Sequence, residues 1–433
     1  MDLLHRRCCG LDIHQAVIVA CVIVQVSARK KKQELRSFST VAAGLREMAE
    51  WIQSMGCTCV AMEGTGVYWM PAYETLEEHV EELVVANARH IKNVPGRKTD
   101  AKDATWICEL ARHGLLRPSF VPPREIRVVR ELTRHRQRLV QSAATERNRL
   151  TKLLERHGVK LSSFLSDVFG VSGREMLKAL IDGKSTPGQM AGLARSSLQR
   201  KKADIERALE APLDETARFV LKSQLDHLTA IEGRIADIER RIDLLLQPHE
   251  QERERLEAIV GVGAVTSAAI LGEVGVDLRS FPNERAFSSW CGVCPGNNMS
   301  AGKRKSSPTN QGNCFMRSLL VECAWAAIKS PGYLRMKYYK LKARRGAKRA
   351  IVAIAHKLAI AVFQVLAKKK DYQELPPEHL ERMEHQQEAR LARRLMARGY
   401  TVIKPESAPE PITSLLVTPK RSKLHKRRAF RSS

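Results

Sequence analysis

The sequence predicts a mixed α/β domain followed by an all-α region, and two observations support this fold class. Within residues 1–120, runs rich in Val, Ile and Cys alternate with stretches of helical periodicity. Beyond residue 121, leucine and isoleucine recur at roughly heptad spacing over two long stretches. The chain also carries 73 Lys and Arg against 47 Asp and Glu, a net charge of +26. This charge indicates a polyanionic partner, with nucleic acid as the first candidate and an anionic membrane as the second.

Composition divides the 433 residues into four regions. A chain of this length supports more than one core, because a single core rarely grows beyond about 250–300 residues. We expect a catalytic α/β domain over residues 1–120 and a helical, coiled-coil region with a small insert over residues 121–250. A helical domain is expected over residues 251–370, and residues 371–433 are expected to form a basic, partly disordered tail.

The ten cysteines predict reduced thiols in a cytosolic protein, because they are scattered and lack the density of a disulfide-rich secreted domain. Cys291 and Cys294 form a CxxC pair, but a second close pair is missing, which favours free thiols over zinc binding. Arg6, Arg7 and the apolar run 16–26 resemble a secretory signal. Polar residues interrupt the approach to that run, and the run is too short to cross a bilayer, so we expect no membrane association.

The predicted elements of the N-terminal domain follow the order of the ribonuclease H fold: three strands, a helix, a strand, a helix, a strand and a final helix. The first two strands form a hairpin, and the third pairs with it. In this topology the first strand lies in the middle of the sheet, and the last helix crosses one of its ends. The expected strands are 7–12, 16–26, 33–40, 57–62 and 82–86, and the expected helices are 43–55, 67–79 and one that begins near Thr99.

Four acidic residues fall where this topology brings them together. Asp12 lies on the first strand, Glu63 ends the fourth, and Asp100 and Asp103 project from one face of the last helix. Like charges this close repel unless a cation lies between them. We therefore predict a magnesium site of the two-metal type, which holds both the attacking and the leaving oxygen of a phosphodiester. The alternative interpretation is that the helix acids only complement the helix dipole.

Two long helices, 124–158 and 212–246, are expected to form an antiparallel pair or an intermolecular coiled coil. The first helix carries many arginines and few acids, which favours contact with nucleic acid through residues such as Arg134 and Arg138. A solvated charged face is the alternative interpretation. The segment 162–210 between the helices is expected to be a small helical insert without chemistry.

The segment 256–271 fits a helix-hairpin-helix element. Its turn, Gly261-Val262-Gly263, exposes backbone N–H groups at the start of a helix, where a phosphate binds. Gly261 and Gly263 are therefore candidate nucleic-acid contacts. The alternative is a buried turn between two packed helices.

A serine on a cationic loop is the candidate nucleophile. Ser300 lies among small, flexible residues and precedes Lys303, Arg304 and Lys305. Positive charge beside a serine stabilises both its alkoxide and the phosphorane formed by attack on phosphorus, although most loop serines have no such role.

The strongest phosphate-binding pattern of the chain spans residues 303–349. This segment contains 13 Lys and Arg and a single acid, Glu322, with tyrosines interleaved. Arg317 and the three cations after the serine are the contacts we expect there. A last apolar helix, 350–366, packs the domain, and a charged helix, 378–398, is expected to be peripheral.

With these motifs in place, the chain resembles the DEDD transposases of the insertion sequence 110 type, a family of RNA-guided recombinases. The resemblance covers roughly residues 8–366. The order and spacing of the motifs are more specific than any one of them. The matching segments are Gly10-Leu11-Asp12-Ile13-His14, Met62-Glu63-Gly64-Thr65-Gly66, Lys98-Thr99-Asp100-Ala101-Lys102-Asp103-Ala104, Gly261-Val262-Gly263, Pro295 to Gly302 and Ala355-His356-Lys357-Leu358.

The resemblance implies a RuvC-like catalytic domain, a coiled-coil linker and a C-terminal transposase domain. Asp12, Glu63, Asp100 and Asp103 would be the Mg²⁺ ligands, and Ser300 would form a covalent 5′-phosphoserine with DNA. In such enzymes the serine of one protomer completes the acidic site of another, within a homodimer or homotetramer. The other implied partners are the DNA of the element ends and the target, and a structured non-coding guide RNA that pairs with both.

One departure from the family leaves the nucleophile open. Residues 300–302 are Ser-Ala-Gly, where many relatives have Ser-Gly-Gly or Ser-Ser-Gly, so Ser306 and Ser307 are weaker alternatives.

Two functions other than a recombinase are alternative interpretations of the same sequence. A metal-dependent nuclease of the Holliday-junction-resolvase type would use the acids without a serine and leave free 5′-phosphates. In a non-enzymatic nucleic-acid-binding protein, Asp100→Ala would leave every activity unchanged.

Overall fold

The computed structural model describes residues 3–27, 29–88, 91, 103–296, 299–300, 303–304, 309–374, 376–399 and 401. Four residues named above as site candidates lie outside the described residues: Asp100, Lys305, Ser306 and Ser307.

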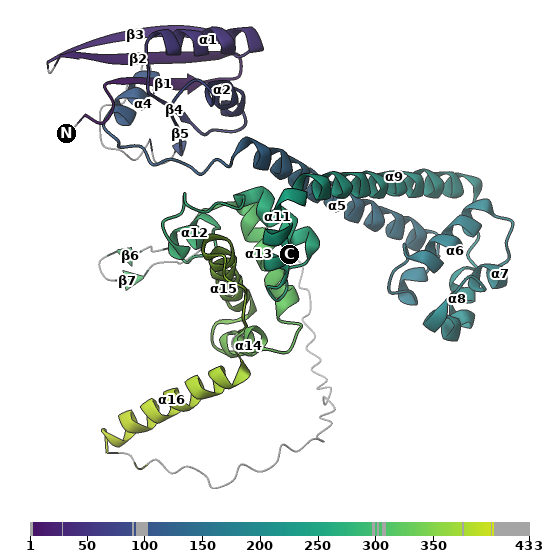
Figure 1. Ribbon diagram of the computed structural model, residues 1–433. Helices are drawn as coiled ribbons and strands as arrows, with labels where there is room; N and C mark the ends of the chain where they lie inside the picture. Colours follow the sequence, from purple (N-terminus) through teal and green to yellow (C-terminus); the bar gives the residue numbers. More distant parts are fainter. Residues whose placement is uncertain are drawn as a thin grey trace, which may run out of the picture.

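A five-stranded sheet forms the centre of the N-terminal domain (Figure 1). Its strands are β1 (Arg7–Ile13), β2 (Val17–Ser27), β3 (Lys30–Ser39), β4 (Cys59–Glu63) and β5 (Glu82–Ala86). The strand order is β3-β2-β1-β4-β5. β1 pairs antiparallel with β2 and parallel with β4, and β5 adds in parallel to β4. The order of strands and helices is therefore the predicted one, and β1 lies in the middle of the sheet as expected.

Helices cover both faces of this sheet. α1 (Ala42–Ser54) and α2 (Trp69–Leu76) pack on one face, in a buried apolar cluster that includes Leu11 of β1. α4 (Asp103–Arg112) covers the other face, and its Ile107 belongs to a second buried cluster. Successive residues of a strand point to opposite faces, so even-numbered residues of β1 face α4.

α4 runs antiparallel to β1, and two observations fix its direction. A Cβ atom on Gly10 would lie 2.3 Å from the carbonyl oxygen of Ala104, near the start of the helix. The backbone N–H groups of Leu4 and His5 donate to the carbonyl of Arg112, at its end, over 2.9 and 3.2 Å. The start of α4 therefore lies beside the carboxyl-terminal end of β1, and its last turn lies beside the segment that precedes the strand.

The two long helices form an antiparallel pair within the chain. They are α5 (Arg124–Arg156) and α9 (Glu215–Leu246), which lie side by side in Figure 1. Ion pairs between the two helices show their relative direction: a residue later in α5 pairs with a residue earlier in α9. This confirms the antiparallel alternative. These pairs are Arg136–Glu239 and Arg147–Glu232.

The segment between the long helices is a small helical insert, as predicted. It packs against the far end of the helix pair, where Leu154 of α5 and Leu221 of α9 share a buried cluster with Met176. Its elements are the 3-10 helices Leu161–Ser163 and Ser196–Lys201 and the helices α6 (Val171–Asp182), α7 (Pro187–Ala191) and α8 (Lys202–Ala208).

The C-terminal region packs around one apolar helix, α15 (Ala347–Lys368). Within the described residues, it is the one helix long and apolar enough to cross a membrane, but its apolar side chains form the core of this region. The helix pair contributes Val129 and Ile242 to the same core. The other elements are the 3-10 helix Gln247–His249, α10 (Glu250–Glu257), α11 (Ala264–Val274), α12 (Glu284–Trp290), β6 (Met299–Ser300), β7 (Lys303–Arg304), α13 (Cys314–Ala327), α14 (Tyr333–Arg345) and α16 (Pro377–Met396).

The proline-rich connection after α4 joins the two halves of the chain. The N–H of Ser119 donates to the carbonyl of Val85 over 2.7 Å, which holds the connection against the sheet. The next residue, Phe120, packs against Phe281 and Trp290, with ring centroids 5.0 and 5.6 Å away. The linker is therefore anchored at both ends.

Candidate active site and nucleic-acid interface

Two of the predicted acids occupy neighbouring strands on the same face of the sheet. Asp12 lies two residues after Gly10 on β1, so its side chain is on the face that α4 covers. Leu11 lies opposite Met62 in the parallel pairing of β1 and β4. Glu63, the residue after Met62, therefore lies beside Asp12 at the carboxyl-terminal ends of the two strands.

The third acid comes from the covering helix. Asp103 is the first residue of α4, and the direction of α4 places that residue at the same end of the sheet. The ligand oxygens of the three carboxylates do not form a group within 4.8 Å of one another among the described residues. The structure thus brings Asp12, Glu63 and Asp103 to one region, and Asp100, the fourth candidate, lies outside the described residues.

Neighbouring side chains bind the two strand carboxylates. The Nε2 atom of His14 lies 3.2 Å from Oδ2 of Asp12, and the hydroxyl of Thr65 donates to Glu63. Both carboxylates are partly exposed, so they remain accessible from solvent. A pair of half-buried carboxylates with fixed orientations provides the oxygen ligands that a hard divalent cation prefers.

The candidate nucleophile lies on a small β-hairpin. β6 and β7 pair antiparallel, with Ser300 opposite Lys303 and Met299 opposite Arg304. Figure 1 shows this hairpin beside α12 and apart from the sheet that carries the acids. In this chain, therefore, Ser300 and the acidic residues belong to separate parts of the molecule.

Backbone pairing closes the base of the serine hairpin. Pro295 and Thr309 form an antiparallel bridge, and the N–H of Asn310 donates to the carbonyl of Cys294 over 3.0 Å. The side chain of Asn310 also donates to the carbonyl of Ser289 over 2.8 Å. These bonds fix both ends of the loop to α12, so the hairpin projects from a rigid base.

A cationic cavity that the sequence analysis did not identify lies next to this base. It has a volume of about 660 Å³, and Pro295 and Thr309 form part of its wall. Its remaining polar lining comes from α14 and α15 and contains no acid. The cations that line the cavity are Lys337, Arg345, Lys348, Arg349 and Lys357. Among the described residues, no carboxylate forms an ion pair with any of them.

His356 lines the same cavity, and its surroundings favour the neutral form of its imidazole. Burial lowers the pKa of His356 below its ordinary value, and the neighbouring charge of Lys357 lowers it further. A neutral imidazole both donates and accepts a hydrogen bond. The cavity therefore combines several positive charges with one uncharged hydrogen-bonding group, which suits a phosphodiester.

The two glycines of the predicted phosphate-binding turn have different surroundings. Gly261 has φ +88°, and a Cβ atom there would lie 2.4 Å from the carbonyl oxygen of Cys323, so this glycine is needed for close packing on α13. Gly263 precedes α11, is exposed, and would meet nothing within 4 Å. Only Gly263 therefore offers room for a phosphate to approach the start of the helix.

The two candidate arginines of α5 also differ. The guanidinium of Arg134 donates to both carboxylate oxygens of buried Glu273, over 2.7 and 3.0 Å, and stacks on Phe315. The side chain of Arg134 is 26% exposed, but its guanidinium is already bound to Glu273, so the structure gives no support to the predicted nucleic-acid contact of Arg134. Arg138 is exposed, which is compatible with the predicted role.

Three of the four remaining candidate cations near the serine, Arg317, Lys303 and Arg304, are among the described residues. Arg317 of α13 donates to the hydroxyl of Thr309 over 3.4 Å, so it contacts the base of the serine hairpin directly. Lys303 and Arg304 form β7 opposite the serine strand. Lys305 lies outside the described residues.

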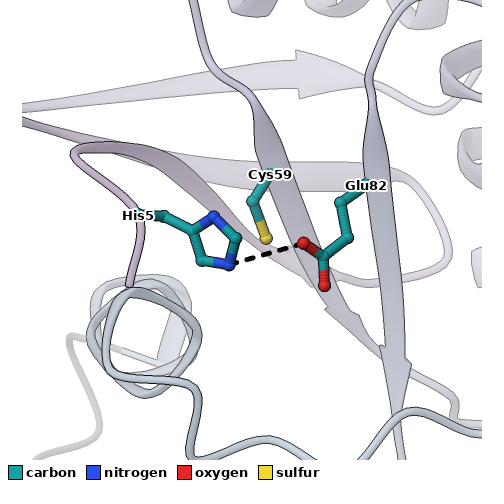
Figure 2. Close-up of side chains that lie close together, drawn as sticks. All are labelled: His5, Cys59 and Glu82. Carbon is teal, nitrogen blue, oxygen red and sulfur yellow. Dashed lines mark ion pairs between the residues drawn. The ribbon is translucent and has the colours of Figure 1, made fainter. Parts of the chain in front are cut away.

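None of the ten cysteines forms a disulfide in the structure. Cys291 and Cys294 do not belong to any metal-type group among the described residues. The one such group in the described part of the chain is His5, Cys59 and Glu82, at the opposite end of the sheet from the acids (Figure 2).

Two family models match separate parts of the chain. A DEDD transposase model of the IS110 type matches residues 9–158, and a model described as transposase, IS116/IS110/IS902 family, matches residues 253–340. The chain belongs to the IS110-type transposases. The first match contains Asp12, Glu63 and Asp103, and the second contains Ser300.

Two curated relatives of this IS110-type transposase have transposase names. The probable family 20 transposase of Pseudomonas aeruginosa is 26% identical over 333 residues, which cover 75% of this chain and 89% of the relative. The transposase for insertion sequence element IS1111A of Coxiella burnetii is 25% identical over 379 residues, 84% of this chain and 90% of the relative. The resemblance inferred from the motifs is thus confirmed. Transposases act as DNA recombinases, so the family supports the predicted enzyme rather than the non-enzymatic alternative.

Proposed function

We propose that this transposase cuts and rejoins DNA by magnesium-dependent phosphoryl transfer through a covalent 5′-phosphoserine at Ser300. The observation that carries the proposal is the placement of Asp12, Glu63 and Asp103 on one face and at one end of the sheet. The strand order and the covering helix are those expected of a ribonuclease H-like, RuvC-like domain, which supports the proposed use of these acids.

The ligand set fits a hard divalent cation. Carboxylate oxygens are the ligands that Mg²⁺ prefers; His14 lies at ion-pair distance from Asp12, and Thr65 donates a hydrogen bond to Glu63. Asp12, Glu63 and Asp103 would hold the metal, together with Asp100. When bound, Mg²⁺ would supply positive charge to the attacking and leaving oxygens of the phosphodiester, and a second ion would complete a two-metal site.

The proposed step exchanges one phosphodiester for another. The hydroxyl oxygen of Ser300 bonds to phosphorus, and the bond from phosphorus to the 3′-oxygen of the DNA breaks. The serine proton passes to a base, and the 3′-oxygen takes up a proton and leaves as a hydroxyl. In the joining step a 3′-hydroxyl attacks the phosphoserine and releases the serine. Because each broken ester is replaced by another, the joining step requires no nucleotide hydrolysis.

A second protomer supplies the serine in this proposal. The hairpin with Ser300 lies apart from the sheet of its own chain, which supports a site shared between protomers of a homodimer or homotetramer (Figure 1). DNA of the element ends and the target, and a structured guide RNA, would bind along the cationic cavity beside the hairpin. A further phosphate would bind at Gly263, in an element of the helix-hairpin-helix type. Such an enzyme acts in the cytoplasm, on the nucleoid.

The test uses the full chain, its element-end DNA and the RNA transcribed beside the gene. Ser300→Ala should abolish the covalent protein–DNA adduct and leave DNA binding unchanged, while Ser306→Ala and Ser307→Ala should retain the adduct. Asp12→Asn and Glu63→Gln should abolish cleavage at any Mg²⁺ concentration. A covalent adduct in the Ser300→Ala protein would overturn the assignment of the nucleophile.

The ends of the products distinguish this mechanism from hydrolysis by the acids alone. A resolvase-type nuclease would leave free 5′-phosphates, which a ligase joins directly. The proposed enzyme would keep those ends attached to protein until joining. Free 5′-phosphates with unchanged cleavage in the Ser300→Ala protein would favour the nuclease mechanism.

A further inference from the structure

The amino-terminal edge of the sheet carries a row of polar side chains on three adjacent strands. Cys8 of β1 lies opposite Cys59 of β4, and Cys59 lies opposite Glu82 of β5. Side chains at paired positions of parallel strands lie on the same face, so this row lies side by side. Cys59 is 1% exposed, whereas the side chain of Glu82 is 53% exposed, so the row runs from the core to the surface.

His5 completes the group from the segment that precedes β1. Its backbone N–H donates to the carbonyl of Arg112 at the end of α4, which fixes its position over the strand ends. Its Nε2 atom lies 3.5 Å from Oε2 of Glu82. Figure 2 shows the imidazole, the thiol of Cys59 and the carboxylate pointing toward one another. One ligand atom from each lies within 4.8 Å of the other two.

We propose that His5, Cys59 and Glu82 bind a zinc ion. Two ligands of a tetrahedral zinc ion, each at about 2.0–2.1 Å, lie about 3.3 Å apart, close to the separation of His5 and Glu82. Thiol, imidazole and carboxylate together are a borderline-soft ligand set that favours Zn²⁺ over Mg²⁺. Binding displaces the thiol proton of Cys59 to solvent, and one thiolate and one carboxylate then balance the charge of the ion. The exposed side of Glu82 leaves a fourth position for water.

This site is separate from the proposed catalytic site. The acids Asp12 and Glu63 end their strands, whereas Cys59 and Glu82 begin theirs, so the two groups lie at opposite ends of the sheet. The zinc ion would join the N-terminal segment to two strands that are distant in sequence. Its role is therefore to stabilise the domain, and the inference does not depend on the proposed serine chemistry.

Cobalt provides a direct probe of the thiol ligand. The full chain, stripped with a chelator and kept in excess Mg²⁺, is titrated with Co²⁺ while near-ultraviolet absorption is recorded. Thiolate-to-cobalt charge transfer should appear and saturate at one Co²⁺ per chain, and Zn²⁺ should remove it. Cys59→Ser should abolish the band, while Cys314→Ser, which removes an exposed thiol elsewhere, should retain it. A band of unchanged strength in Cys59→Ser would overturn the proposal.

Thermal stability provides a second test, with a variant of His5, which is less buried than Cys59. Zn²⁺ should raise the melting temperature of the parent protein and of His79→Ala, which removes an exposed histidine. It should have no such effect on His5→Ala. An equal rise in His5→Ala and the parent would overturn the site. Neither zinc experiment bears on whether Asp12→Asn loses Mg²⁺-dependent cleavage. The zinc site and the proposed catalytic mechanism are therefore tested separately, and one can be wrong while the other holds.

Discussion

Arg134 and Glu273 form a bidentate ion pair in the core between α5 and α11, with N–O distances of 2.7 and 3.0 Å. Glu273 is 1% exposed, and it also accepts a hydrogen bond from Asn313 over 2.6 Å. Asn313 caps α13 and donates its own N–H to the carbonyl of Trp290. This one carboxylate therefore connects the helix pair to the base of the serine hairpin.

We expect Glu273→Ala to destabilise the protein by about 3–5 kcal/mol, because it leaves the guanidinium of Arg134 without its buried partner. Chemical denaturation of the C-terminal region measures the loss. The matched control is Glu239→Ala, which removes the partner of Arg136 on a more exposed face. That variant should cost at most about 1 kcal/mol. Equal losses for the two variants would contradict a special role for the buried pair.

Gly10 is the residue that allows α4 to contact the sheet. A Cβ atom there would lie 2.3 Å from the carbonyl oxygen of Ala104 and 2.4 Å from the amide nitrogen of Cys108, and both are backbone atoms that cannot rotate away. Gly10→Ala should therefore destabilise the protein by about 1–3 kcal/mol and displace Asp103 from the other acids. Thermal unfolding and Mg²⁺-dependent cleavage should both decline.

The control for Gly10→Ala is Gly263→Ala, because an added Cβ there meets nothing within 4 Å. Its melting temperature should match that of the parent protein. A Gly10→Ala protein as stable and active as the parent would show that α4 does not pack as described.

The cationic cavity should contribute to DNA affinity by neutralising phosphates. Removing two of its cations with Arg345→Ala and Lys348→Ala should weaken binding and make its dependence on salt less steep. The slope of log K against log salt should fall by about 0.9 for each phosphate that the variant no longer neutralises. Binding titrations at several salt concentrations measure both effects.

A double variant with the same change of net charge serves as the control. Lys184→Ala and Arg240→Ala remove two exposed cations from the insert and from α9. They should leave the salt slope unchanged, because neither residue lines the cavity. If both double variants weakened binding equally, net charge rather than the cavity would account for the effect.

An ion pair between the sheet domain and α5 makes their connection sensitive to acid. Arg127 donates to both carboxylate oxygens of Glu77 on the C-terminal side of α2, and this hydrogen bonding lowers the pKa of Glu77. A depressed pKa means that the stabilisation is complete above the ordinary pKa of a glutamate and is lost as the pH falls through the lowered value.

Glu77→Gln tests this dependence. The parent should lose up to about 1 kcal/mol more stability than Glu77→Gln when the pH is lowered from 6 to about 3, since a partly exposed pair contributes little. Melting temperatures across this range measure the difference. Glu47→Gln, which removes the partner of Arg36 within the sheet domain, is the control for general acid effects on surface pairs. Parallel pH profiles for the parent and Glu77→Gln would contradict the prediction.

Local patterns allowed most of the fold to be predicted. The order of strands and helices, the bounds of β5 and the extent of the long helices follow from hydrophobic period and turn residues, which act over a few neighbouring positions. Element ends were less accurate, as shown by β3, which begins at Lys30 rather than at residue 33. Its pairing with β2 extends the strand beyond what its own charged sequence favours.

The candidate catalytic residues could be proposed from the sequence, because each lies in a short motif at the end of an element. The cationic cavity was not, since its wall combines α14, α15 and the two ends of a loop that comes well before them in the chain. Lys348 and Arg349 belong to the cation-rich segment 303–349, but nothing in the local sequence places them around one cavity. The group of His5, Cys59 and Glu82 depended likewise on strand register.

The sequence by itself determined the family, the order of the elements and which acids and serine are the catalytic candidates, because these depend on residue types at short spacing. Only the tertiary structure decided which positively charged side chains are already bound to carboxylates and which are available to bind nucleic acid. The arginines of α5 outnumber the acids of their own helix, yet Arg134 pairs with Glu273 and Arg136 with Glu239, each more than a hundred residues away. An ion pair depends on distance in space, and packing brings together carboxylates and guanidinium groups that the chain order keeps apart.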